Sequence, residues 1–340
     1  MTARARRELL AAAIALLASM AVGSALMLIF AKSPGQVWWA MLSRTATEPY
    51  VLGQVLYRAT GLALTGLAGA LALDAGLFNI GAENQAAAGV LGAAVIGTAL
   101  PAATPAVIAI PLCLIVAAAA GGAMGAAIGG LRVQRGANEV ITSIMLNAIV
   151  AGVTLYLGNR FIFRNGTTTG APIASSAELP QLGIGGSPAN ASIAIAAAAV
   201  VVMWWLRSRT TWGQAWRAVG QSPEAARATG IAVGKVQTLL MAGSGALAGL
   251  VASNVVMGHK HVFEEGLSRG IGLQGLAVAL LGRMHPLGVA AAALVLGFVS
   301  AGGLVVSDLI PKELVELLPG VVMLSVAATE AWVRRREAAS

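Results

Sequence analysis

Residues 105–130 read PAVIAIPLCLIVAAAAGGAMGAAIGG, a stretch that contains no charged side chain. An α-helix needs roughly 20 predominantly apolar residues to cross a bilayer, so this stretch is long enough to span one. Gly121, Gly125 and Gly129 stand four residues apart within it, and small residues at this spacing allow helices in a membrane to approach closely. The stretch therefore predicts a membrane-spanning helix that packs through its glycines against other helices.

The rest of the chain has the same character, and Gly245 and Gly249 repeat the four-residue spacing. Of the 340 residues, 57% are hydrophobic and 11% are charged, whereas soluble domains carry about 25% charged residues. The 42 glycines and the aromatic content of 5% are typical of closely packed helices. A membrane β-barrel would instead show alternating strands of about ten residues. We therefore expect an all-α integral membrane protein with one transmembrane domain over residues 1–340.

Apolar runs recur along the chain, and we expect about ten membrane segments; eight full spans plus two re-entrant segments are the main alternative. When the N-terminus is placed in the cytoplasm and each run crosses once, most of the 22 Lys and Arg residues fall on the cytoplasmic side, as the positive-inside rule requires. We therefore expect a multi-pass protein of the cytoplasmic (inner) membrane, in contact with membrane lipid, with both termini in the cytoplasm. The runs are 9–30, 52–73, 82–100, 105–130, 140–157, 190–206, 238–257, 270–282, 287–306 and 314–332.

The charge and the reactive side chains exclude several classes of protein. The net charge of +8 does not indicate nucleic-acid binding, because the basic residues lie between apolar runs. The sequence has no Gly-x-x-x-x-Gly-Lys-Ser/Thr motif, so we expect ATP and Mg²⁺ on a separate ATPase and no cofactor on this chain. It has no His-Glu-x-x-His motif and no Ser, His and Asp grouping, so we expect no catalytic residue. His259, His261, Glu264 and Glu265 resemble a metal cluster, but on an outer loop we expect them to contact a binding protein, and we predict no metal site.

Two membrane segments are interrupted by polar and glycine residues. The first runs from Asp74 to Gln85 (DAGLFNIGAENQ), and the second, residues 270–282, is glycine-rich at its start and too short to cross alone. Each is the third segment in its half of the chain. Interrupted segments at matching positions point to a transport site between inverted repeats, since irregular backbone at membrane depth is tolerated only beside protein or a water-filled path. The two segments therefore predict a transport site.

The cytoplasmic loop 207–237 contains the signals of a short helix at residues 222–230 (SPEAARATG). Ser222 can cap its start, Pro223 suits the first helical position, and Gly230 can end it. A short charged helix between two spans suits contact with a cytoplasmic partner. An ordinary surface helix is the alternative reading.

The Glu-Ala-Ala sequence at 224–226, followed by Gly230, resembles the EAA loop of ABC importer permeases. The stretch 217–231, with Ser-Gly-Ala-Leu-Ala-Gly at 244–249, is similar to the branched-chain amino acid and simple-sugar permease superfamily. The resemblance implies that 222–230 is the coupling helix that docks into an ATPase subunit. The coupling residues that it implies are Arg217, Ser222, Pro223, Glu224, Ala225, Ala226, Arg227 and Gly230.

Three further stretches, 78–85, 138–147 and 272–283, resemble the permeases for nucleosides. The resembling pieces cover residues 52–300 in the same order along the chain. They imply the inverted-repeat permease fold of type II-like ABC importers. One departure is Asn84, where that family usually has Gly, and a larger polar group there can narrow the path or change what it accepts.

The resemblance implies that the chain is the permease subunit of an ATP-binding cassette importer that carries nucleosides or related simple sugars. It also implies that the chain is not an enzyme. Its partners would be a cytoplasmic ABC ATPase, a second permease subunit, identical or different, and an extracytoplasmic substrate-binding protein. One alternative is an ABC permease for another small polar solute, such as a sugar or a branched-chain amino acid. An ion-coupled secondary transporter is a second alternative, but it would need a deep carboxylate pair, and only Glu83 is a candidate. An intramembrane enzyme is disfavoured by the missing catalytic grouping.

Polar side chains in the interrupted segments suit passage of a nucleoside. Asn79, Glu83 and Gln85 lie in an otherwise apolar region, where ionisable groups normally face a cavity or a partner. Amides pair with base edges or ribose hydroxyls, and Phe78 offers a stacking face. The alternative that Asn79 and Glu83 only brace the broken helix stays open, and for Asn147 bracing is the favoured reading. The predicted path residues are Phe78, Asn79, Glu83, Asn84, Gln85, Asn147 and Gln274.

Overall fold

The computed structural model describes residues 3–101, 103–164, 167–306 and 309–311, with residues 317, 320–322, 324, 325 and 328. The apolar run predicted at 314–332 therefore lies largely outside the described residues. The helices are α1 (Ala3–Ile29), α2 (Pro34–Thr47), α3 (Pro49–Asp74), α4 (Ala82–Ala99), α5 (Ala106–Arg135), α6 (Glu139–Leu157), η1 (Gly158–Ile162), η2 (Ser175–Ala177), α7 (Ser192–Arg209), α8 (Thr211–Gln221), α9 (Pro223–Ala228), α10 (Val233–Gly249), η3 (Ser253–Lys260), α11 (Ile271–Leu281) and α12 (Pro286–Val305).

The described part of the chain is mainly helical and contains six helices that are long and apolar enough to cross a membrane. The short α11 begins and ends within the predicted run 270–282. The total of ten segments stays a prediction. The six spans are Pro49–Asp74, Ala106–Arg135, Glu139–Ile162, Ser192–Arg209, Val233–Lys260 and Pro286–Gly303.

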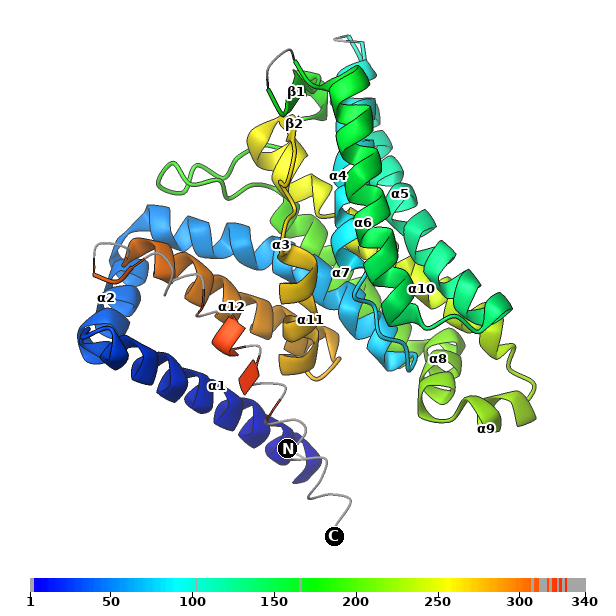
Figure 1. Ribbon diagram of the computed structural model, residues 1–340, viewed down its shortest axis with the longest axis horizontal. Helices are drawn as coiled ribbons and strands as arrows, with labels where there is room; N and C mark the ends of the chain where they lie inside the picture. The colour runs from blue at the N-terminus through cyan, green and yellow to red at the C-terminus, as the bar shows by residue number, and fades with distance from the viewer. Residues whose placement is uncertain are drawn as a thin grey trace.

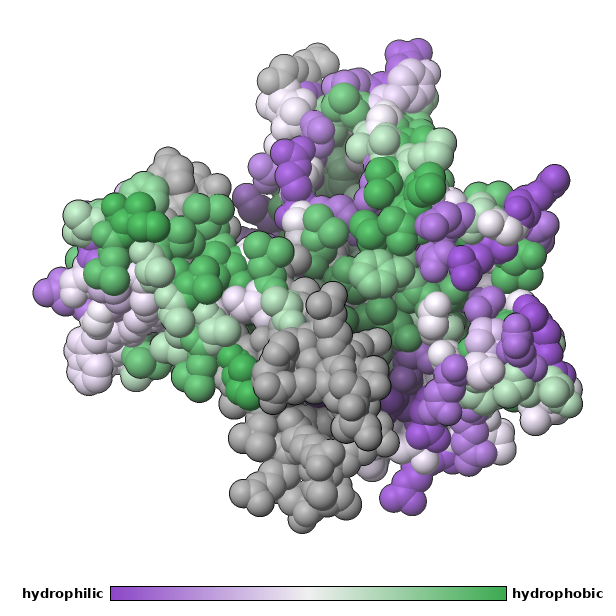
Figure 2. Space-filling model, turned by 60° about the horizontal axis from the view of Figure 1, so that its bottom comes forward, coloured by the Kyte–Doolittle hydropathy of each residue, from purple (hydrophilic) through white to green (hydrophobic). Residues whose placement is uncertain are grey.

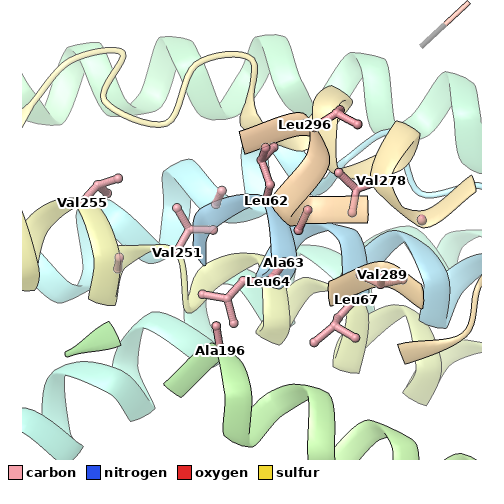
Figure 3. Packing of buried hydrophobic residues seen from close by; sticks show 14 of the residues in the cluster. Leu62, Ala63, Leu64, Leu67, Ala196, Val251, Val255, Val278, Val289 and Leu296 are labelled. Atoms are coloured by element: carbon pink, nitrogen blue, oxygen red, sulfur yellow. The ribbon is translucent and has the colours of Figure 1, made fainter. Parts of the chain in front are cut away.

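Helix α3 lies at the centre of the fold. Along most of its length its residues are buried, among them Leu62, Leu64 and Leu67. Figure 3 shows these side chains packed among residues of α7, α11 and α12. Small residues make the contacts close: a Cβ on Gly66 would lie 2.6 Å from Val278 Cγ1 of α11. Close packing through small residues is what holds helices together in lipid, where the hydrophobic effect gives no attraction between helices.

The glycine faces of α5 and α10 pack directly on each other. This confirms the prediction that the glycines spaced four residues apart in each helix form packing faces. A Cβ on Gly121 or Gly125 would overlap the backbone carbonyl of Gly245 or Met241. A Cβ on Gly249 would overlap the carbonyl of Ala117 in the same way. The two helix backbones therefore touch, and no larger side chain fits between them.

Both interrupted segments leave the helical conformation before their helices begin. Helix α3 ends at Asp74, residues 75–81 turn back with Gly76 at φ +72°, and α4 starts at Ala82. Gly270, at φ +81°, precedes α11. A positive φ is strained for residues with a Cβ, so glycine suits both turns.

The two ends of the molecule are built differently. Figure 1 shows β1 and β2 at the upper end of the bundle of α4, α5 and α6, and α8 and α9 at its lower end. The strands β1 (Thr169–Pro172) and β2 (Val262–Glu264) pair antiparallel, a feature that the all-α prediction did not include. Seen from below, polar residues gather on the side of α8 and α9 (Figure 2), and much of the surface of the opposite side is apolar.

Candidate functional site

The two interrupted segments meet with their helix N-termini against each other. Gly272, in the first turn of α11, lies so close to α4 that a Cβ there would overlap the backbone nitrogen of Glu83. Both helices begin beside α3: a Cβ on Gly61 would lie 2.6 Å from Ile271 Cδ1 of α11, and Ala82, the first residue of α4, packs in a cluster with Ala68. The broken helices therefore converge beside the central span α3.

The Glu83 carboxylate joins these two N-termini. It accepts hydrogen bonds from the backbone N–H of Gly270 and, at 2.9 Å, from that of Gly272. The first N–H groups of a helix have no partner within the helix, and a negative charge there also offsets the positive end of the helix dipole. Glu83 therefore braces the junction, and it also lines the cavity described below.

Asn79 and Gln85 form a closed amide pair beside the junction. Asn79 Nδ2 donates to Gln85 Oε1 at 2.8 Å, and Gln85 Nε2 donates to Asn79 Oδ1 at 3.1 Å. Asn79 Nδ2 also donates to Ser244 Oγ, whose hydroxyl donates to the carbonyl of Ala68 on α3. Both amides are buried. Because their polar atoms bond to one another, this geometry favours the bracing reading for Asn79 and Gln85.

A cavity of about 280 Å³ opens next to the junction, between α4, α6 and the segment from β2 to α11. Asn84 of α4 and Asn147 of α6 both line it. Among the described residues, the buried side-chain oxygens Asn84 Oδ1 and Asn147 Oδ1 have no hydrogen-bond partner. The polar residues that line the cavity include Glu83, Asn84, Asn147, Thr154, Ser268 and Arg269.

The unpaired amide oxygens indicate what the cavity accepts. A buried polar group without a hydrogen bond costs free energy, so such groups normally find a protein, water or ligand partner. Asn84 makes only one weak contact, from its Nδ2 to the carbonyl of Ser143 at 3.5 Å. Two amides with unpaired oxygens, on two helices that line the same cavity, are therefore suited to a solute with hydrogen-bond donors.

The remaining predicted path residues lie elsewhere. Phe78 is exposed on the turn before α4. Gln274 lines a second cavity of about 190 Å³, together with Arg58 and Arg269. Arg269 borders both cavities, and the sequence analysis assigned it no role. The sequence analysis also assigned no role to Thr154, which lines the first cavity. The one sequence signal for it is a hydroxyl group within the apolar run 140–157.

The short helix predicted at 222–230 is present as α9, with the cap and the terminating glycine that the sequence predicts. Ser222 Oγ accepts the backbone N–H of Ala225 at 3.2 Å, Pro223 is the first residue, and Gly230 has φ +85°. Glu224 and Arg227 are exposed. Ala226 is buried in a small cluster with Val219 and Val233, which holds α9 against α8 and the start of α10. Helix α9 is therefore a fixed, charged projection at the lower end of the molecule (Figure 1).

Three of the four residues that resemble a metal cluster, His259, His261 and Glu264, contact side chains outside that group. Lys260 forms an ion pair with Glu264 at 3.2 Å, and His261 Nδ1 lies 3.9 Å from Glu178. The Tyr57 ring meets the His259 ring edge to face at 5.2 Å. In the described residues no group of three His, Cys, Asp or Glu side chains is placed to hold a metal ion.

Comparison with known proteins gives close matches over nearly the whole chain. A family model described as branched-chain amino acid transport system / permease component matches residues 51–327. The guanosine ABC transporter permease protein NupP of Bacillus subtilis is 34% identical over 331 residues, which cover 95% of this chain and 94% of that protein.

Two further relatives are similar at the same level. The nucleoside ABC transporter permease protein NupB of Lactococcus lactis is 31% identical over 332 residues, 94% of this chain and 91% of that protein. The glucose ABC transporter permease protein TsgB13 of Haloferax volcanii is 32% identical over 337 residues, 95% of this chain and 88% of that protein. These likenesses therefore take in the cavity, the junction and α9 together.

Proposed function

The chain belongs to the branched-chain amino acid transport system / permease component family, and we propose that it is the membrane-spanning permease subunit of an ATP-binding cassette importer for nucleosides. Two of its relatives are named as guanosine and nucleoside permeases. A third is named as a glucose permease at similar identity, so a simple sugar is the second candidate solute.

The observation that carries this proposal is the cavity of about 280 Å³ with two unpaired amide oxygens. This volume lies near the lower end of the range for small-molecule sites, which suits a solute of nucleoside size. The Asn84 and Asn147 side chains can accept hydrogen bonds from the amino groups of a base or from ribose hydroxyls, and their own NH₂ groups can donate. The hydroxyl of Thr154 and the Arg269 side chain add further polar contacts.

The proposed cycle uses the junction as the moving part. An extracytoplasmic binding protein delivers the solute to the side of β1 and β2, and a cytoplasmic ATPase docks on α9. ATP binding on the ATPase moves α9, and the broken helices α4 and α11 then switch the cavity between outward and inward access. A second permease subunit completes the complex. The chain itself binds neither ATP nor a metal in this scheme.

The same scheme assigns an orientation. Helix α9 and both termini lie in the cytoplasm, and the strands lie on the outer side of the inner membrane. Helices α4 and α11 count as membrane segments that begin inside the bilayer, which accounts for their short or interrupted sequences.

Reconstitution in liposomes tests the function. We expect that the chain, together with the ATPase, second permease and binding protein that co-purify with it, takes up labelled guanosine only when hydrolysable ATP is present. Unlabelled nucleosides should compete with the label, and glucose should not. Uptake by the chain alone, driven by an ion gradient, would instead establish a secondary transporter. Competition by glucose but not by nucleosides would replace the nucleoside by a sugar.

A further inference from the structure

Asp74, the last residue of α3, is held by two neighbouring helices. Arg207, near the end of α7, donates from Nε to Asp74 Oδ2 at 2.7 Å and from Nη2 to Asp74 Oδ1 at 3.0 Å. Trp216 of α8 donates from Nε1 to Asp74 Oδ2 at 3.0 Å. The Asp74 and Arg207 side chains are only 13% and 23% exposed. A two-point guanidinium–carboxylate pair of this kind fixes direction as well as distance.

The backbone of α8 also lies directly on this end of α3. A Cβ on Gly220, in the last turn of α8, would overlap the carbonyl of Asp74. On the other side of the contact, a Cβ on Gly76 would lie 3.4 Å from the carbonyl of Gly220. The last turn of α8 therefore rests on the turn with which the interrupted segment begins.

Helix α8 leads without a loop into the coupling helix. It ends at Gln221, and the next residue, Ser222, caps α9. Val219 of α8 and Ala226 of α9 are buried against each other. A displacement of α9 therefore moves α8, and α8 is fixed to Asp74 by the Trp216 side chain and by the backbone contact of Gly220.

We propose that Asp74, Arg207 and Trp216 form a clamp that transmits the movement of α9 to the interrupted segment, and that the three are positioning residues for solute transport. From Asp74 the chain runs through residues 75–81 to Glu83, which binds the N-terminus of α11. The clamp thus joins the coupling helix to the junction beside the cavity along one continuous stretch of chain. The proposal rests on the function proposed above.

The test compares solute uptake with ATP hydrolysis in the assembled importer in liposomes. We expect Asp74→Asn to retain ATP hydrolysis and to lower the number of solute molecules taken up per ATP by roughly 2- to 30-fold, the range over which single residues change coupling between sites. Trp216→Phe, which removes one N–H and keeps an aromatic ring, should lower the same ratio by less. It also serves as the second variant if Asp74→Asn does not assemble.

The matched control is Glu139→Gln. Glu139, at the start of α6, pairs with Arg132 of α5, so this change also removes one carboxylate from an ion pair near helix ends, but one made by α5 and α6 and not by α3, α7 and α8. Its uptake per ATP should equal that of the unchanged importer. Three results would overturn the clamp. The first is normal solute uptake per ATP in both clamp variants, and the second is a fall in uptake matched by an equal fall in ATP hydrolysis. The third is the same fall in uptake per ATP in Glu139→Gln. If the unchanged importer shows no ATP-dependent uptake, the proposed function fails as well, so the two failures are distinguishable.

Discussion

Replacing the amide of Asn147 is the most direct test of whether the cavity binds solute. Its Oδ1 is buried without a partner and borders the cavity from α6. We expect Asn147→Leu, which keeps the volume and removes the amide, to raise the half-saturating nucleoside concentration roughly tenfold, the effect of losing one hydrogen bond of about 1.4 kcal/mol. The measurement is initial uptake against solute concentration. Asn159→Leu, at an exposed asparagine of η1, is the control and should behave like the unchanged protein. An unchanged half-saturating concentration in Asn147→Leu would remove this residue from the path.

Glu83 distinguishes bracing from direct contact with solute. Its carboxylate accepts the backbone N–H groups of Gly270 and Gly272 at the N-terminus of α11, so Glu83→Gln loses charge-assisted bonds worth about 1.5–3 kcal/mol. We expect a lower midpoint of thermal unfolding for the detergent-solubilised protein, with Glu178→Gln, on the loop between η2 and α7, as the control. Normal thermal stability together with a large rise in the half-saturating concentration would show direct contact instead.

The sequence identified the polar residues of the first interrupted segment but could not separate their roles. Asn84, Ala87 and Val90 line the cavity, since residues three and four apart share one face of a helix. Gln85 points away and bonds to Asn79. The starting residue and rotation of α4 decide this difference, and both depend on the contact with Gly272, which lies far away in the sequence.

At the scale of elements, the contact between α4 and α11 makes a sharp prediction for Gly272. A Cβ at this position would overlap the backbone of Glu83, so Gly272→Ala must separate the two broken helices. We expect a loss of stability of about 1–3 kcal/mol, as for other overpacked sites, and a matching fall in uptake. The control is Gly152→Ala on α6, where a Cβ meets no atom within 4 Å. Equal thermal stability of the two variants would mean that the junction is not closed in this way.

Helix α9 makes a prediction about assembly. Glu224 and Arg227 are exposed, so replacing both by Ala should leave the fold intact and weaken docking of the ATPase. We expect roughly tenfold or more lower affinity for the ATPase, as when a central interface residue is truncated, and a corresponding loss of ATP-dependent uptake. Co-purification of the ATPase measures the first effect. Arg209→Ala, at an exposed cation at the end of α7, should leave co-purification unchanged. Normal ATPase binding and uptake in the double variant would remove the coupling role of α9.

The sequence predicted the elements that have a local signal and missed those that depend on packing. The cap, proline and glycine signals gave α9 with its observed ends. Helix α8 lies in the same predicted loop, but it was missed because it has no apolar run, and its buried Trp216 bonds to Asp74, which lies far away in the sequence. The strands β1 and β2 were missed for a related reason, since they are short and lie far apart in the sequence.

At the scale of the whole molecule, the features combine into one path between two ends. The cavity lies toward the end with β1 and β2, and α9 lies at the opposite end (Figure 1). Between them stand the clamp at Asp74 and the junction at Glu83. Each contact is short and made by buried or half-buried groups, so a displacement at one end is not absorbed by loose chain in between.

This arrangement requires that α9 and the outer loops face opposite sides of the membrane, which labelling of single cysteines can test. The one natural cysteine, Cys113, is buried in α5, so it leaves a low background. We expect Ala228→Cys on α9 to react with a membrane-impermeant maleimide only from the cytoplasmic side, because the basic residues near α9 favour that side under the positive-inside rule. Leu182→Cys, at an exposed position on the loop before α7, should react only from outside. Labelling of both cysteines from the same side would contradict the orientation and with it the proposed coupling to a cytoplasmic ATPase.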